Sequence, residues 1–270
     1  MYRFYIQPNE WNPDALALRG GEARHARTVL RMTRGEKAVL FNGRGRELTA
    51  EIIDFGRDQI HFRKLHEAET APLRCSIVLV QAIPKGKNMD LIVQKAVEIG
   101  ASEIVPVISE RTIIDLDPHE AGQRQSRWQQ VAVEAAKQCG QNWLPQVHLP
   151  RKLKDFFAHF PLETSRSGAN PRDMQPRKLA ELRLPQLRLI GSLQRDAQHL
   201  KKILADYAGE YQHLPTGVLM FIGPEGDFTP AELALAKAHG CLPITLGPII
   251  LRVETAAIYC LSVLSYELLV

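Results

Sequence analysis

The segment with the clearest chemical potential is a glycine-bounded turn, GPEGD over residues 223–227, which follows an apolar run over 217–222. A helix should begin directly after it, because Thr229 can serve as the N-cap, Pro230 suits the first helical position and Glu232 can complete a capping box. Glycines in a strand–turn–helix unit let a ligand approach the backbone, and open α/β sheets bind cofactors at the carboxyl ends of their strands. A turn without any ligand is the alternative, and this segment alone leaves both open.

The charge of this turn narrows the class of ligand. It carries two acids, Glu225 and Asp227, and no lysine, and it matches neither the GxxxxGK[ST] nor the GxGxxG phosphate-binding pattern. A phosphate group is therefore disfavoured. A ligand with hydroxyls, an amine or a positive charge fits better.

A second loop, which leads into the last helix, is apolar where a surface loop would be polar. Over residues 249–253, all positions except Arg252 hold large apolar side chains. This composition is typical of the walls of a pocket for a flat apolar group such as adenine, with Arg252 as the one charge at its edge. The alternative is that these side chains fill the core, and spacing alone slightly favours it.

The elements that must position both loops alternate between strands and helices. Apolar runs predict strands over 75–82, 103–108, 187–191, 217–222 and 242–246, and helical periodicity predicts helices over 88–99, 126–138, 197–207 and 255–270. The first two strands should be parallel, because a helix connects them. The C-terminal part is therefore expected to be an α/β domain with a mainly parallel sheet, and its last helix to be buried or to form an interface.

The N-terminal part shows short strands separated by turns. Strands are expected over 2–7, 38–42, 48–55 and 59–65, with a helical piece over 22–30, and a small β-barrel accounts for them most simply. Residues 67–72 lack apolar periodicity and end in a proline, so we place domains over 1–71 and 72–270. Residues 161–186 hold four prolines and should form a surface excursion.

Positive charge is concentrated near the N-terminus. The 28 residues from Arg19 to Arg46 carry a net charge of +6, whereas the other 242 residues sum to −2. Such asymmetry suggests a surface that faces a polyanion, and a merely solvated face is the alternative.

The four cysteines exclude some other classes of protein. Cys75, Cys139, Cys241 and Cys260 form no CxxC pair and lie in apolar contexts, so neither a zinc site nor a disulfide framework is expected. Reduced, buried thiols of a cytoplasmic protein fit best. No segment reaches the roughly 18 apolar residues of a membrane span, and the N-terminus lacks the apolar region of a signal peptide.

In combination, these motifs resemble the RsmE family of small-subunit ribosomal RNA methyltransferases, which belong to the SPOUT superfamily. The signature loops are Gly223-Pro224-Glu225-Gly226 and the stretch from Leu246-Gly247-Pro248 to Leu251-Arg252-x-Glu254-Thr255-Ala256. Further matches follow in the family's order along the whole chain: His25, Val29–Arg31, Gly35, Asn42–Gly45, Lys87, Met89, Gln94–Ala96, Glu98, Gly100, Pro106, Ser109–Arg111, Arg127–Trp128, Glu134–Ala135, Gln138 and Gly140.

The resemblance implies a PUA-like β-barrel followed by a SPOUT α/β domain, whose C-terminal segment threads a deep trefoil knot around S-adenosylmethionine. It also implies methylation of uridine N3 in small-subunit ribosomal RNA, within an assembled or nearly assembled subunit, by a homodimer with its active site near the subunit interface. Three positions depart from the family. Asp227 stands where a second glycine is usual, and Ile249 and Gln141 stand where arginine is common.

The resemblance and the local chemistry together assign roles to individual residues. Arg252 is the candidate for stabilising the base as it loses its proton, and Glu225 and Glu254 are candidate proton acceptors. Glu254 could instead only stabilise the helix that it begins. The cofactor should contact backbone and apolar groups of Gly191, Ile222, Gly223, Gly226, Leu246, Gly247, Ile250 and Leu251, and no metal is expected. RNA phosphates should contact Arg24, Arg31, Arg34, Arg44, Arg46, Lys85 and Lys87.

Two other functions remain compatible with the sequence. A related SPOUT enzyme could share both loops and methylate another base or a ribose 2′-hydroxyl. A non-catalytic RNA-binding protein would keep the barrel and have lost the cofactor, a reading that Asp227 and Ile249 keep open.

Overall fold

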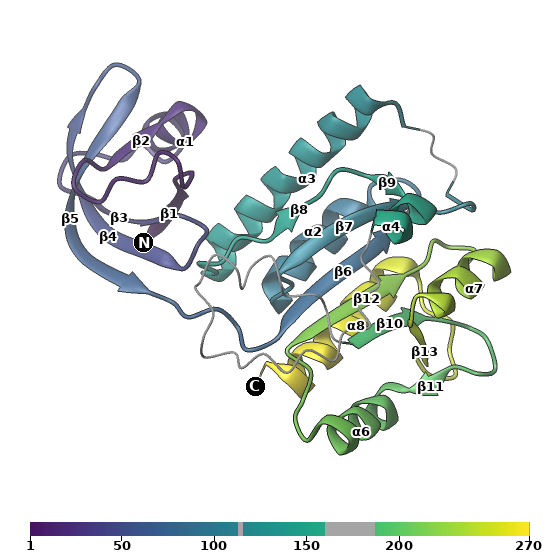
Figure 1. Cartoon of the computed structure of the whole chain (residues 1–270). Helices are drawn as coiled ribbons and strands as arrows, with labels where there is room; N and C mark the ends of the chain where they lie inside the picture. The colour runs from purple at the N-terminus through teal and green to yellow at the C-terminus, as the bar shows by residue number, and fades with distance from the viewer. Residues whose placement is uncertain (113–115, 160–186, 270) are drawn as a thin grey trace. The chain divides into compact units, whose positions relative to one another are not determined.

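A computed structural model of the chain describes residues 1–112, 116–159 and 187–269 (Figure 1). By its contacts the chain divides into two compact units. The first comprises Met1–Pro72 and Gln130–Pro145, and the second comprises Leu73–Gln129 and Gln146–Val270. Helix α3 (Pro118–Cys139) contributes residues to both units. The excursion expected over 161–186 lies outside the described residues.

The first unit is built on a five-stranded sheet in the order β1-β3-β4-β5-β2, as far as the described residues show. Its strands are β1 (Tyr2–Tyr5), β2 (Ala17–Arg19), β3 (Lys37–Phe41), β4 (Arg46–Phe55) and β5 (Gln59–Glu69). The four expected strands are present, and β2 was not predicted. Irregular register between β4 and β5, after Thr49 and after Ile52, bends the sheet. The expected small barrel is therefore a curled half-barrel, whose described pairings leave β1 and β2 as its edges.

The helical piece expected over 22–30 is a short helix, α1 (Gly20–Arg24), continued by a π-helix over His25–Val29. The side chains of Phe4, Leu40, Leu48 and Ile52 are fully buried in the concave core of this unit. The half-barrel therefore has a hydrophobic core of its own.

The second unit is a layered α/β structure, and all of its described strand pairs are parallel. The strands follow the order β11-β13-β10-β12-β6-β7-β8, and β9 also pairs with β7. The central strands are β6 (Ser76–Ala82), β7 (Glu103–Ile108), β10 (Leu187–Gly191), β12 (Gly217–Ile222) and β13 (Leu242–Thr245), and the short ones are β8 (Gln146–Val147), β9 (Arg151–Lys152) and β11 (Gln198–His199). The expected parallel α/β domain is confirmed.

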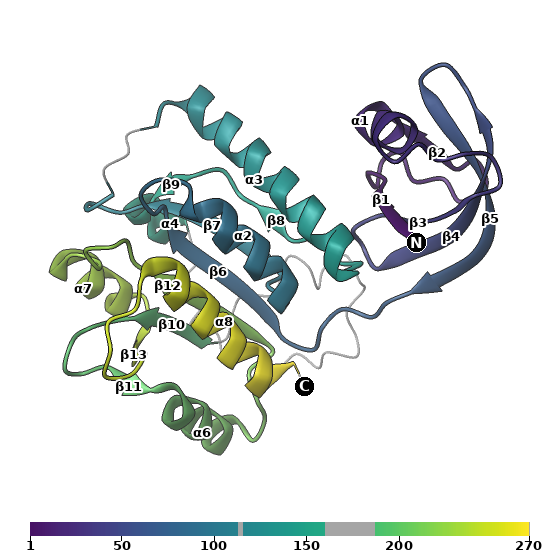
Figure 2. The same ribbon diagram turned by 180° about the vertical axis from the view of Figure 1, so that it is seen from behind.

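Helices cover both faces of this sheet. Helices α2 (Asn88–Ile99) and α8 (Val253–Leu268) lie side by side on one face, and α4 (Leu153–His159) and α7 (Pro230–Ala238) cover the other (Figures 1 and 2). Helix α6 (Leu200–Tyr211) begins three residues later than expected, and α3 begins eight residues earlier. Phe221 of β12 stacks on Phe157 of α4, with ring centroids 5.3 Å apart, in the core of the second face.

The cysteines are free, as expected, but not all of them are buried. Burial raises the pKa of Cys75 to about 11 and the pKa of Cys241 to about 12, and it raises the pKa of Cys260 to about 12. These three thiols are therefore poor nucleophiles at neutral pH. Cys139 is exposed at the end of α3, so the expectation of a buried thiol is wrong there. Within the described ranges, no helix has both the length and the apolarity needed to cross a membrane.

Candidate functional site

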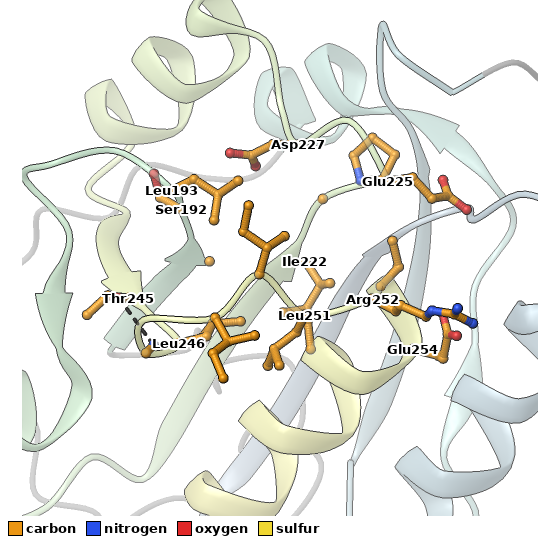
Figure 3. A pocket seen from close by; sticks show the side chains of 18 of the residues that line it. Ser192, Leu193, Ile222, Glu225, Asp227, Thr245, Leu246, Leu251, Arg252 and Glu254 are labelled. Carbon is orange, nitrogen blue, oxygen red and sulfur yellow. Dashed lines mark hydrogen bonds between the residues drawn. The ribbon is translucent and has the colours of Figure 1, made fainter.

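A cavity of about 730 Å³ opens at the carboxyl ends of β10, β12 and β13 (Figure 3). Its walls are the loops that follow these strands, together with Asn88 at the start of α2 and the first turn of α8. Because neighbouring parallel strands end at the same edge of a sheet, loops far apart in the sequence meet here. The volume lies in the range of pockets that enclose a small molecule or a cofactor.

The predicted cofactor-binding and catalytic residues gather around this cavity with one exception. Its lining includes Gly191, Ile222, Gly223, Leu246, Gly247, Ile250, Leu251, Glu225, Arg252 and Glu254. Gly226 is exposed and is not part of the lining. The loop after β10 also contributes Ser192, Leu193 and Gln194, which the sequence analysis did not name. The rule that ligands lie at carboxyl ends of strands could have found them, since β10 was predicted correctly.

The turn after β12 is folded by its own hydrogen bonds and by the helix that follows. The backbone N–H of Asp227 donates to the Pro224 carbonyl oxygen at 2.9 Å. Thr229 caps α7, and its hydroxyl and the Glu232 carboxylate form the expected capping box. A Cβ atom at Gly223 would lie only 3.2 Å from the Phe228 nitrogen, a tight contact that favours glycine because a side chain would force the neighbouring backbone to shift.

The turn after β13 is fixed in a different way. Gly247 has a left-handed φ of 111°, which an L side chain rarely adopts, and its N–H donates to the Thr245 hydroxyl at 3.3 Å (Figure 3). Ile249 and Ile250 are 74% and 76% exposed at the mouth of the cavity, so the alternative in which they fill the core is wrong. Leu251 is half-buried beside the cavity.

The charged groups are distributed unevenly around the cavity. Figure 3 shows Glu225, Arg252 and Glu254 on one side, and Ser192, Leu193 and Thr245 on the other. A Glu225 carboxylate oxygen accepts the Lys85 backbone N–H at 2.8 Å, and a Glu254 carboxylate oxygen accepts the Asn88 side-chain amide at 3.2 Å. The Arg252 side chain is exposed, and within the described residues its guanidinium has neither a hydrogen bond nor an ion pair, whereas its backbone carbonyl accepts the Ala256 N–H at 2.8 Å. Its guanidinium is available to a ligand.

Comparison with known proteins identifies the family to which this chain belongs. Residues 71–265 match the family described as RNA methyltransferase domain, and residues 18–65 match the RNA methyltransferase PUA domain. The chain belongs to the RsmE family of RNA methyltransferases. A Bacillus subtilis relative, ribosomal RNA small subunit methyltransferase E, is 25% identical over 282 residues, which cover 99% of this chain and 97% of the relative.

Two solved structures are similar over nearly the whole chain. A putative methyltransferase of Legionella pneumophila, solved with bound S-adenosylmethionine, is 32% identical with a TM-score of 0.79, covering 98% of this chain and 97% of that one. The Neisseria gonorrhoeae ribosomal RNA small subunit methyltransferase E, also bound to S-adenosylmethionine, is 29% identical with a TM-score of 0.77 and covers 99% and 98%. The predicted fold class, a PUA-like sheet followed by a SPOUT α/β domain, is confirmed.

The structure explains one departure from the RsmE pattern. Asp227 has a left-handed φ of 61°, the conformation that the family's usual glycine adopts most easily. Aspartate tolerates this region better than most side chains, because its short carboxylate can hydrogen-bond locally. Here an Asp227 carboxylate oxygen accepts the Phe228 N–H at 2.8 Å. The turn therefore keeps a glycine-like backbone without the glycine.

The predicted RNA-binding residues lie in both units. Arg24, Arg31, Arg34 and Arg44 are exposed on the first unit, and Lys85 and Lys87 are exposed in the loop after β6 of the second. Arg46 is only partly exposed and forms an ion pair with Glu67, which reduces its availability to a phosphate. Gln141, the third departure, accepts the Trp143 backbone N–H at 3.2 Å within the first unit.

Proposed function

We propose that this RsmE-family protein transfers the methyl group of S-adenosylmethionine to N3 of a uridine in small-subunit ribosomal RNA. The observation that carries the proposal is that both signature loops line one cavity of about 730 Å³. Two relatives that match 99% and 97% of this chain are named ribosomal RNA small subunit methyltransferase E. Two similar structures were solved with S-adenosylmethionine bound.

The lining of the cavity fits the chemical parts of this cofactor. Ile222, Leu246 and Leu251 offer an apolar surface to an adenine ring. Backbone groups at Gly191, Gly223 and Gly247 are accessible because no side chain covers them.

The polar groups at the rim fit as well. Glu225, Asp227 and Glu254 give the rim a negative character, which suits a ligand that carries an ammonium and a sulfonium charge. When bound there, S-adenosylmethionine supplies an electrophilic methyl group on a positively charged sulfur.

The chemistry of the acceptor nitrogen, uracil N3, determines which groups the protein must supply to the substrate. Uracil N3 carries a proton at neutral pH, and this proton must leave as, or before, the nitrogen attacks the methyl carbon. Negative charge then develops on the base and its carbonyl oxygens. Arg252, exposed at the rim and unpaired within the described residues, is positioned to donate hydrogen bonds to them.

One of two carboxylates is proposed to accept the N3 proton. Glu225 is exposed, and Glu254 is half-buried in the first turn of α8. One oxygen of each carboxylate is held by a donor, Lys85 N–H for Glu225 and the Asn88 amide for Glu254, which orients the side chain. Geometry alone does not choose between them, so both stay candidates.

The exposed arginines of the first unit are proposed to bind RNA phosphates, together with Lys85 and Lys87. Phosphate contacts position an RNA without reading its sequence, so this surface cannot select the target nucleotide. An assembled or nearly assembled small subunit is proposed as the substrate.

A homodimer is proposed because the outer face of α8 exposes two tyrosines, Tyr259 and Tyr266. Its inner face is buried, and its outer face presents Thr255, Tyr259, Ser262 and Tyr266 at helical spacing. Leu91 of the neighbouring α2 is also exposed. A second copy of the chain on this face would bury these residues. The deep trefoil knot stays a prediction from the family resemblance.

Two alternatives are separable by simple measurements. A SPOUT enzyme of other base or ribose specificity would leave a different methylated nucleoside, which mass analysis of ribosomal RNA from a deletion strain identifies. A non-catalytic RNA-binding protein would show no thermal shift with S-adenosylmethionine. The glycine-like backbone at Asp227 favours an intact cofactor turn.

Gly223→Val tests the cofactor site. The new side chain must displace the backbone at Phe228, and such overpacking costs about 1–3 kcal/mol. We expect the Kd for S-adenosylmethionine, measured by calorimetry, to rise by at least about tenfold. Gly209→Val in α6 is the control, because a Cβ there has no neighbouring atom within 4 Å. Equal affinities for the two variants would exclude this cavity as the cofactor site.

Arg252→Ala tests the stabilisation of the base. We expect methyl transfer to undermethylated small subunits to fall by about 10²–10³-fold, as on loss of a donor to a developing anion, with the cofactor Kd changed less than about twofold. Arg195→Ala, which removes an exposed arginine just beyond the cavity lining, is the control. Unchanged turnover of the Arg252 variant would remove this residue from the mechanism.

A double variant, Arg24→Ala with Arg34→Ala, tests the phosphate-binding surface. Each lost phosphate contact should lower the slope of log affinity against log salt by about 0.7–0.9. Fluorescence anisotropy with a small-subunit RNA fragment at several salt concentrations measures this slope. Arg63→Ala is the control, because Arg63 is exposed on the same unit but paired with Glu51 at 3.1 Å. An unchanged slope would place the RNA elsewhere.

Tyr266→Glu tests the proposed dimer. Tyr266 is 74% exposed on the outer face of α8, and a carboxylate buried there between two copies would lack a partner. We expect sedimentation equilibrium to show a dimer for the unaltered chain and a monomer for the variant. Tyr2→Glu on β1 should leave the dimer intact. A monomeric unaltered chain, or a variant that still dimerises, contradicts the proposal.

A further inference from the structure

The turn over residues 223–227 is held by a loop that the cofactor cavity does not include. This loop, Ser109–Thr112, follows β7. In the sheet, β6 lies between β7 and β12, so contacts between the two loops pass over the carboxyl end of β6. The pairing of the strands does not require the loops after β7 and β12 to be joined, so these contacts have another role.

Three hydrogen bonds make this bridge, and a fourth, within the capping box of α7, shares one of their acceptors. Arg111 Nη1 donates to the carbonyl oxygen of Gly226. The Thr229 hydroxyl donates to a Glu110 carboxylate oxygen at 3.0 Å. The Glu232 carboxylate accepts the Glu110 backbone N–H at 2.8 Å and the Thr229 backbone N–H at 2.9 Å. The capping box of α7 is thus extended to the end of β7.

One part of the bridge is buried, and the other part, the Glu110–Thr229 and Arg111–Gly226 contacts, is exposed. Glu232 is only 6% exposed, so its two hydrogen bonds are protected from water. At the other end, Gly226 is exposed, and the Cδ atom of Arg111 would lie 3.4 Å from a Cβ at this glycine. Arg111 therefore covers the outer side of the turn while its guanidinium holds the carbonyl.

We infer that Arg111 is a positioning residue for cofactor binding, acting through the Gly226 carbonyl to fix the shape of the turn before the cofactor arrives. The inference rests on the proposed function, since it assumes that this turn contacts S-adenosylmethionine. Without Arg111, the turn keeps its internal hydrogen bond from Asp227 to Pro224 but loses its outer restraint. Ordering the turn then becomes part of the cost of binding, and the affinity falls.

The charge of Arg111 suggests a competing role in which its exposed guanidinium binds an RNA phosphate. The two roles differ in what they change. A positioning role changes the affinity for the cofactor in the absence of RNA. A phosphate contact changes only the apparent affinity for the ribosomal substrate.

Arg111→Ala in the full chain separates these roles. We expect the Kd for S-adenosylmethionine, measured by calorimetry without RNA, to rise about tenfold, which corresponds to about 1.4 kcal/mol. The KM for S-adenosylmethionine should rise by a similar factor, while kcat at saturating cofactor stays within about threefold, because the turn is ordered once the cofactor is bound. Arg111→Lys keeps a donor and should recover part of the affinity.

Two comparisons complete the experiment. Arg151→Ala removes an exposed arginine from β9, which pairs with the end of β7, and should leave the cofactor Kd unchanged. Glu110→Ala removes the contact with the Thr229 hydroxyl and should weaken cofactor binding in the same direction as Arg111→Ala. Melting temperatures of all variants verify that the fold persists.

The outcomes are distinguishable from a failure of the proposed function. If the unaltered chain binds no S-adenosylmethionine, the proposed function is wrong. If it binds and Arg111→Ala binds equally well, the inference is overturned, and a raised KM for the ribosomal substrate alone would then assign Arg111 to RNA.

Discussion

The parallel arrangement of β6, β7, β10, β12 and β13 is the constraint on which the site depends. A parallel strand cannot return through a hairpin, so each connection crosses a face of the sheet and each strand ends at the same edge. Loops separated by more than a hundred residues therefore meet there, as the Lys85 N–H and the Glu225 carboxylate do. All parts of the cavity lie at this edge. The strand ends supply backbone groups, the loop after β13 supplies apolar walls, and charged side chains lie at the rim.

The sequence predicted β6, β7 and β12 well because they are almost entirely buried and read as continuous apolar runs. It predicted the start of α7 to the residue, since Thr229, Pro230 and Glu232 encode a local capping box. It missed β2, because three residues, Ala17–Arg19, carry too little periodicity to stand out from a loop. It missed the first two turns of α3, although Asp117 caps this helix locally by accepting the Glu120 N–H at 2.8 Å and Pro118 occupies its first position. It also missed the curl that leaves the half-barrel open, which depends on tertiary packing rather than on local pattern.

Glycines and apolar loops in the sequence made the location of the site predictable. Which residues line the cavity depends on backbone geometry, which the sequence does not show. Ile249 and Ile250 could be core residues by their type, yet they are exposed at the cavity mouth, just after Gly247, whose φ is left-handed. Gly226 looks like a lining residue, yet its carbonyl is directed to Arg111. Ser192, Leu193 and Gln194 have no motif at all and enter the cavity only because β10 ends beside β12 and β13.

The positions at which this chain departs from the family pattern show which features of such a site can vary. A pocket that contacts its ligand through backbone groups constrains φ and ψ at each position more than side-chain chemistry. Asp227 satisfies that constraint, because it adopts the left-handed conformation and returns its carboxylate to the Phe228 N–H. A β-branched residue at 227 would meet the same backbone requirement at a higher energetic cost and without the local hydrogen bond. Ile249 instead changes an exposed side chain at the mouth of the cavity, where the family commonly has a positive charge, so the departure at 227 keeps the backbone shape of its turn whereas the departure at 249 alters the surface.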